Sequence, residues 1–136
     1  MKSKRIYLNE KKTKYCIVKL FKKRKEMHEY YSKEKPDEKF NEFLLGVHLA
    51  YERWDKKTGK IKSETGTVLL SLEDCAGSIV SHEFMHAILW AYKHKKYKKQ
   101  YPITIKDMKE EEKLLHRMSL AVHNFYSWYW DVKKLV

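Results

Sequence analysis

The chain has 136 residues, enough for one hydrophobic core and too few for two independent ones to be favoured. Its 30 Lys and Arg outnumber its 18 Asp and Glu, so the net charge is +12. A hydrophobic content of 43% with 14% aromatics excludes a disordered tail, and only four Gly and two Pro exclude collagen-like and linker sequences. We therefore expect a single domain over residues 1–136.

Features that target a chain to a membrane or for export are not found. No apolar run approaches the roughly 18 residues that a membrane span needs, and the basic start Met1–Arg5 has no apolar segment behind it. Cys16 and Cys75 are separated by 59 positions and form no CxxC pattern, so we expect reduced thiols. These features predict a cytoplasmic protein with no membrane contact.

The basic excess is uneven along the chain. Residues 1–39 hold 14 Lys and Arg against six Asp and Glu, and a second lysine cluster lies within Lys93–Lys99. A field of this sign attracts nucleic acid or an acidic protein, whereas a solvated lysine-rich surface that keeps the protein soluble gives the same composition. The charge leaves both interpretations open.

The first half of the chain reads as strands around one helix. Tyr15–Phe21 is rich in β-branched and aromatic residues and predicts a strand, and Lys22–Lys35 predicts a helix that Pro36 stops. Glu42–Trp54 predicts a second strand, with helix as the competing prediction, and a turn over 55–60 leads to a third strand at Thr65–Leu70. The fold class that follows is α+β with a three-stranded, mostly antiparallel sheet.

Two helices follow in the second half. Ser71–Asp74 fits a capping box, and the apolar residues that run from Ile79 to Ala91 leave almost no polar face, which predicts a buried helix. Thr104–Asp107 is a second capping box. It opens a long C-terminal helix whose apolar residues recur at three- and four-residue spacing from Leu114 to Phe125.

The buried helix contains the pattern HExxH. Two histidines four residues apart, His82 and His86, lie on one helical face within reach of a single Zn²⁺, while Glu83 is positioned to take a proton from a metal-bound water. The bare pattern arises by chance in roughly 3% of chains of this composition. Burying two imidazoles and a carboxylate in an apolar helix is costly unless they are paired or bind a metal, which favours a zinc site.

A catalytic zinc takes three protein ligands, and the third is open from the residues alone. Candidates are the glutamates at the start of the last helix, followed by His116 and His123. Glu111 lies on the axis of that helix's apolar face. Glu112 instead heads a polar stripe, in which the residue at i+4 could hold a ligating imidazole by a hydrogen bond.

The segment resembles the ImmA/IrrE-type metallopeptidases and the short zincin-like proteins of phages and prophages. Their HExxH helix is followed by a Glu-x-x-small-Asn/Ser-x-apolar-small segment, and Glu112–Ser119 follows that spacing, with His116 at the polar position and Leu115 departing from the usual small residue. The resemblance covers roughly residues 66–125. It implies a zincin-like fold, Glu112 as the third ligand rather than Glu111, and a regulatory protein as substrate; a histidine ligand would look more like the SprT-type proteases.

These features favour two alternative functions. The first is a zinc-dependent metallopeptidase with His82, His86 and Glu112 as ligands and Glu83 as general base, with a protein or peptide as substrate. The second is a zinc-stabilised binding module whose basic surface contacts nucleic acid or a protein partner without catalysis. Candidates for stabilising an oxyanion are His123 and Tyr92.

Two further segments have a structural and a functional interpretation. Thr65–Leu70 is either an internal strand or the edge strand along which a peptide substrate pairs. The aromatic residues between Phe125 and Trp130 are expected to close the core rather than to stack on bases.

Overall fold

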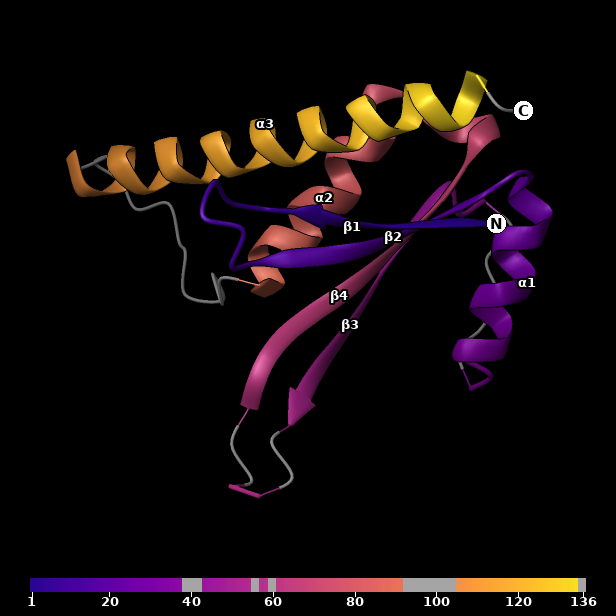
Figure 1. Cartoon of the computed structure of the whole chain (residues 1–136), viewed down its shortest axis with the longest axis horizontal. Helices are drawn as coiled ribbons and strands as arrows, with labels where there is room; N and C mark the ends of the chain where they lie inside the picture. Colours follow the sequence, from indigo (N-terminus) through magenta and orange to yellow (C-terminus); the bar gives the residue numbers. More distant parts are fainter. Residues whose placement is uncertain (38–42, 55–56, 59–60, 92–104, 135–136) are drawn as a thin grey trace.

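The structure is a computed structural model that describes residues 1–37, 43–54, 57–58, 61–91 and 105–134; for residues 50–54, 61–65, 105–108 and 110–111 it describes the backbone only. Two pairs of strands, separated by one helix, precede two C-terminal helices in an α+β arrangement (Figure 1). The strands are β1 (Lys2–Tyr7), β2 (Tyr15–Phe21), β3 (Gly46–Trp54) and β4 (Ile61–Ser71). The helices are α1 (Arg24–Glu34), the 3-10 turn η1 (Leu72–Asp74), α2 (Gly77–Ala91) and α3 (Ile105–Lys134).

The described strands form one four-stranded mixed sheet in the order β1-β2-β4-β3. β2 and β4 run parallel, while β1 pairs with β2 and β3 pairs with β4 in antiparallel fashion. The α+β class is confirmed, but the prediction of three mostly antiparallel strands is wrong in detail. The sequence analysis missed β1 because four of its six residues are exposed and Ile6 is its one fully buried side chain, so no apolar alternation marks it.

The order of the strands also decides which edges are free. β4 is hydrogen-bonded on both sides, to β2 and to β3, so the interpretation of Thr65–Leu70 as an edge strand is wrong. β1 and β3 are the edges of the sheet. Gly46, the first residue of edge strand β3, lies against Glu83 of α2.

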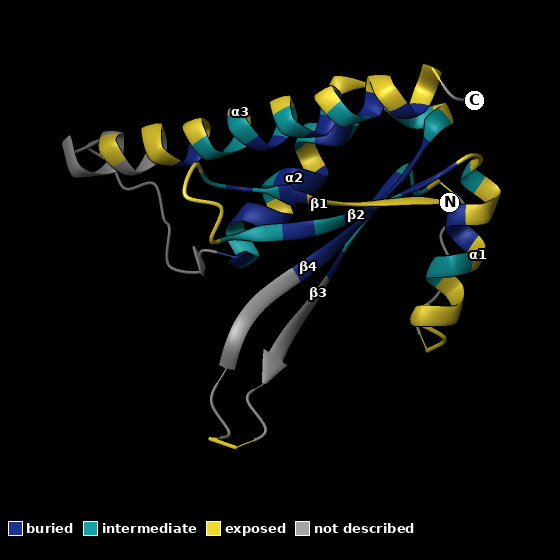
Figure 2. Cartoon of the chain, viewed as in Figure 1, coloured by how far each residue is buried: buried dark blue, intermediate teal, exposed yellow. Residues whose placement is uncertain are grey.

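Helices cover both faces of the sheet. α2 and α3 pack on one face, where the larger core cluster includes Val18 and Val68 from the sheet and Phe84 and Phe125 from the helices. α1 packs on the other face, where Met27 meets a smaller cluster from the strands. The exposed residues of α3 lie on the side turned away from α2 (Figure 2).

The C-terminal aromatic residues mostly close the core, as predicted. Phe125 and Tyr129 are buried, and the Phe125 ring lies 5.7 Å from that of Phe84 on α2. Trp130 is the exception, since it is 55% exposed. In the part of the chain that is described, no helix is both long and apolar enough to cross a membrane.

The start of α2 differs from the prediction. The helix begins at Gly77, not directly behind Ser71, because Leu72–Asp74 forms η1, and the hydroxyl of Ser71 donates to the Asp74 carboxylate at 3.0 Å. The Arg24 guanidinium donates two further hydrogen bonds of 2.7 Å to Asp74 and holds the pKa of that carboxyl below its usual value. The residues of the predicted capping box therefore do not cap α2; through Asp74 they connect η1 to Arg24 of α1. The second one, Thr104–Asp107, and the turn over 55–60 lie largely outside the described residues, although α3 does begin at Ile105.

Candidate metal and catalytic site

α2 presents the two histidines of HExxH on the side of the helix that its buried apolar residues leave exposed. Val80, Phe84, Ala87 and Ile88 are buried against the sheet and α3, which fixes the rotation of the helix about its axis. With that rotation His82 and His86 are exposed, whereas Glu83 is only 6% exposed and points inward. One buried carboxylate therefore lies beside two accessible imidazoles.

The two imidazoles converge. Nε2 of His82 and Nε2 of His86 are 3.1 Å apart, and the rings meet edge to face with centroids 4.7 Å apart. Two nitrogens bound to one tetrahedral Zn²⁺ at about 2.05 Å each are roughly 3.3 Å apart, so the pair fits two positions of one zinc ion. Without a metal, at most one N–H···N hydrogen bond satisfies these two atoms. The donor pair therefore fits the metal that the motif implies.

Glu83 lies beside the pair in a restricted position. Its Oε1 is 4.0 Å from Nε2 of His82, and burial raises the pKa of its carboxyl, an effect that the nearby His82 opposes. A Cβ added to Gly46 would lie 2.9 Å from Cγ of Glu83 and 3.2 Å from Leu70. Gly46, at the start of edge strand β3, is therefore the residue that leaves room for the glutamate.

A pocket of about 330 Å³ opens directly onto these groups. His82 and Glu83 contribute its polar side, together with Ser78, and the remainder is largely apolar. Its walls are formed by Phe43, Leu44, Leu45, Gly46, Ser78, Ile79, His82 and Glu83. Because Phe43 is 79% exposed, the pocket has an apolar side chain on the surface beside it. A side chain bound here would lie next to the carboxylate of Glu83.

A third histidine, His48 of β3, lies behind the pair. Its ring stacks on that of His86 with centroids 6.3 Å apart and planes 10° apart. Nε2 of His48 is buried and has no hydrogen-bond partner among the described residues, and it rests on Gly66 of β4, where any Cβ would overlap the ring. Burial and the neighbouring His86 lower the pKa of His48 to about 4, and burial together with His82 lowers the pKa of His86. Both rings are thus favoured in the neutral form that can ligate a metal.

The predicted third ligand lies on α3, where Glu112 is exposed. His116 is also exposed, and its Nε2 lies 3.1 Å from Oε1 of Glu10, in the connection between β1 and β2. His123 is exposed as well, and the side chain of Glu111 lies outside the described residues. Among the side chains that are described, no three from His, Cys, Asp and Glu form a group able to hold a metal ion. The structure therefore brings together His82, His86 and Glu83, and it does not add Glu112 to them.

Comparisons with known proteins give no relative. No family model matches the chain, and no curated protein or solved structure is significantly similar to it. The resemblance to ImmA/IrrE-type metallopeptidases thus remains a prediction based on the motif and its spacing.

Sequence reasoning missed the two glycines and His48. Neither Gly46 nor Gly66 carries a motif, and each matters only because a histidine or glutamate from a distant segment packs on it. His48 has no spacing relation to His82 or His86, so only strand pairing brings it to α2. The Cys75 thiol donates to the Ser71 carbonyl at 3.0 Å. Tyr92 lies outside the described residues.

Proposed function

We propose that the chain is a zinc-dependent metallopeptidase. The observation that carries this proposal is the convergence of the two Nε2 atoms, 3.1 Å apart, beside a buried glutamate that lines a pocket. A structural zinc site would be expected to use four protein ligands and would give Glu83 no purpose. A general base, in contrast, has to be held close to the metal with its carboxylate directed at the substrate position.

In this proposal His82 and His86 hold the metal through Nε2, and Glu112 of α3 is the third ligand, with Glu111, His116 and His123 as alternatives. Bound zinc would polarise a peptide carbonyl and lower the pKa of its bound water towards neutrality. The neutral state of His86 favours its role as ligand, because a protonated imidazole has no lone pair for a metal.

The remaining residues of the site supply the general base, position it and form the adjoining pocket. Glu83 accepts a proton at a carboxylate oxygen and can return it to the leaving amine, and Gly46 and His82 restrict where that carboxylate lies. The largely apolar pocket beside it is open to the surface and could accept one side chain of a peptide. A regulatory protein is the substrate class that the resemblance to phage and prophage proteins implies.

The test compares Glu83→Gln with the wild type on a library of quenched fluorescent peptides, with zinc content measured on the same samples. We expect the variant to keep its zinc and its melting temperature and to lose 10²-fold or more in kcat/KM. Glu29→Gln, at an exposed position of α1, is the matched control and should be fully active. The zinc-stabilised binding module predicts no peptide cleavage by the wild type and no change in Glu83→Gln, and that result would replace the proposal.

A further inference from the structure

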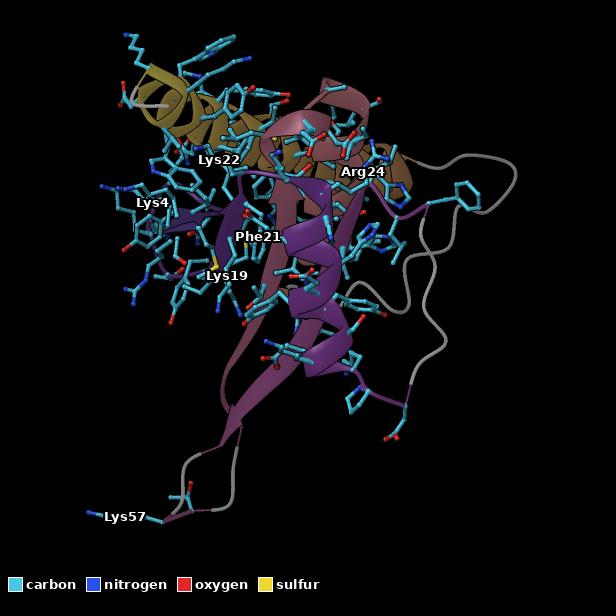
Figure 3. The ribbon with its side chains drawn as sticks, turned by 90° about the vertical axis from the view of Figure 1, so that its right-hand side faces the viewer. Lys4, Lys19, Phe21, Lys22, Arg24 and Lys57 are labelled. Carbon is cyan, nitrogen blue, oxygen red and sulfur yellow. The ribbon has the colours of Figure 1, made fainter. Side chains whose placement is uncertain are left out.

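The hairpin formed by β1 and β2 holds much of the basic charge. Residues 2–21 contain seven Lys and Arg and one acid, Glu10, so they carry a net charge of +6, half of the +12 of the whole chain. Glu10 is engaged by His116 of α3. Figure 3 shows Lys4, Lys19 and Lys22 on the same side of the structure. Half of the net positive charge is therefore concentrated in this hairpin.

Aromatic rings lie among these cations on one face of the hairpin. Cys16, Val18 and Leu20 of β2 point into the core with α2 and α3, so the alternate residues point to the opposite face. Strand pairing sets Tyr7 beside Tyr15, with ring centroids 6.2 Å apart.

The cations are in contact with those rings. The Arg5 guanidinium lies 4.2 Å from the centre of the Tyr15 ring, and the Lys12 ammonium lies 5.8 Å from that of Tyr7. Lys19 reaches Tyr30 of α1, with its ammonium 2.7 Å from the phenol oxygen. We call these six residues the hairpin face: Arg5, Tyr7, Lys12, Tyr15, Lys19 and Tyr30.

A hollow adjoins the hairpin face at the edge of the sheet. It has a volume of about 460 Å³ and lies between β1 and α3. Arg5, Tyr7 and Lys12 line it as well as belonging to the hairpin face, so the two surfaces are continuous. Lys4 adds a further cation, and the Asn124 amide donates to the Tyr7 carbonyl on the α3 side. Three cations and one acid surround a space large enough for a phosphate group and part of its sugar.

We propose that the hairpin face and this hollow bind single-stranded nucleic acid. Bases can stack on sheet-borne aromatic rings while phosphates pair with the cations between them, which is how single strands are bound without a sequence code. A duplex fits less well, because the hairpin is part of a sheet covered by α3 and does not project as a free ribbon into a groove. An acidic protein would use the charge but would leave the exposed parts of the tyrosine rings without a role. The inference does not depend on the metallopeptidase activity.

The test is fluorescence anisotropy of the full chain with a fluorescein-labelled oligo(dT) of about 12 nucleotides, at several salt concentrations. Arg5→Ala with Lys12→Ala should weaken binding at least tenfold and lower the slope of log affinity against log salt by about 1.4. Lys109→Ala with Lys134→Ala removes the same charge from exposed positions of α3, and we expect a loss below threefold.

Ring substitutions separate stacking from charge. Tyr7→Leu with Tyr15→Leu leaves the net charge unchanged and should weaken binding about tenfold or more, whereas Tyr7→Phe with Tyr15→Phe keeps the rings and should bind within threefold of the wild type. Thermal melts of each variant verify folding. Because Arg5 and Lys12 are exposed, their variant keeps the test decisive if the leucine variant does not fold.

Three results would overturn the proposal. The first is no binding of oligo(dT) at 50 mM salt. The second is an equal loss in the hairpin and α3 lysine variants, which would indicate a diffuse charge effect only. The third is equal or tighter binding of a labelled duplex or of an oligoglutamate peptide, which would assign the surface to duplex DNA or to an acidic protein.

Discussion

The position of Glu83 depends on the absence of a side chain at Gly46, which makes Gly46→Ala a specific perturbation of the proposed site. The new Cβ would lie 2.9 Å from Cγ of Glu83, whereas carbon atoms in contact prefer about 3.5–4.0 Å. The side chain of Glu83, the backbone of β3 or both must therefore move by roughly 0.6–1.1 Å. Movement in the other direction is restricted, because the same Cβ would lie 3.2 Å from the fully buried Leu70.

We expect Gly46→Ala to lower catalytic activity and stability without lowering zinc content. A displacement of about 1 Å in a catalytic group can cost about 10²-fold in rate, so kcat/KM of Gly46→Ala should fall by that order. Overpacking of this kind also lowers the free energy of unfolding by about 1–3 kcal/mol. The zinc content should stay at the wild-type value, because the Gly46 contact is to Glu83 and not to His82 or His86.

The assay measures peptide cleavage, zinc content and urea unfolding on the same samples. Gly77→Ala is the matched control, since a Cβ there would meet nothing within 4 Å, and it should be as active as the wild type. Equal activity of the two alanine variants at equal zinc content would refute the argument that Gly46 positions Glu83. Loss of zinc in Gly46→Ala would also refute it, because the contact would then act on the ligands.

Three further predictions concern stability. Gly66→Ala forces the ring of His48 to move and should lower the free energy of unfolding by about 1–3 kcal/mol in urea titrations; an unchanged midpoint would contradict the close packing. Phe84→Ala empties a fully buried site and should cost about 3–5 kcal/mol, and a loss below 1 kcal/mol would show that the core is packed differently. Arg24 lowers the pKa of Asp74 below its ordinary value near 3.8, so the stability from this pair is present at neutral pH and is lost as the pH falls below roughly 5 towards the lowered pKa. Asp74→Asn should remove that part of the acid dependence, and an identical pH profile for the variant would contradict it.

The core strands and helices were predictable because their apolar residues recur at the spacing typical of a strand or of a helix. Tyr15–Phe21 alternates buried and half-buried side chains and forms a strand with the predicted bounds, and α3 follows its three- and four-residue apolar spacing. β1 was not predictable in this way. Its basic residues stay in solvent at the edge of the sheet, and pairing with β2 stabilises it more than its own pattern does.

Some residues of the candidate site were likewise predictable from local spacing, and others were not. The sequence identifies His82, Glu83 and His86 because one helix turn sets their relation. The partners that complete the surroundings come from strands, and no local spacing encodes them: Gly46 and His48 reach α2 only through the pairing of β3 with β4. The third ligand is undetermined for the same physical reason, since it depends on how the start of α3 lies against α2.

The most direct test of the metal site is the zinc content of the purified protein, measured by mass spectrometry on the wild type and on four alanine variants, at His82, His86, Glu111 and Glu112. We expect about one zinc per chain in the wild type, its loss in both histidine variants, and its loss in Glu112→Ala but not in Glu111→Ala. Loss in Glu111→Ala alone would keep the site and reassign its third ligand. A wild-type protein that carries no zinc and gains no thermal stability when zinc is added would contradict the proposed zinc site, and the His82–His86 pair would then be a hydrogen-bonded feature of α2.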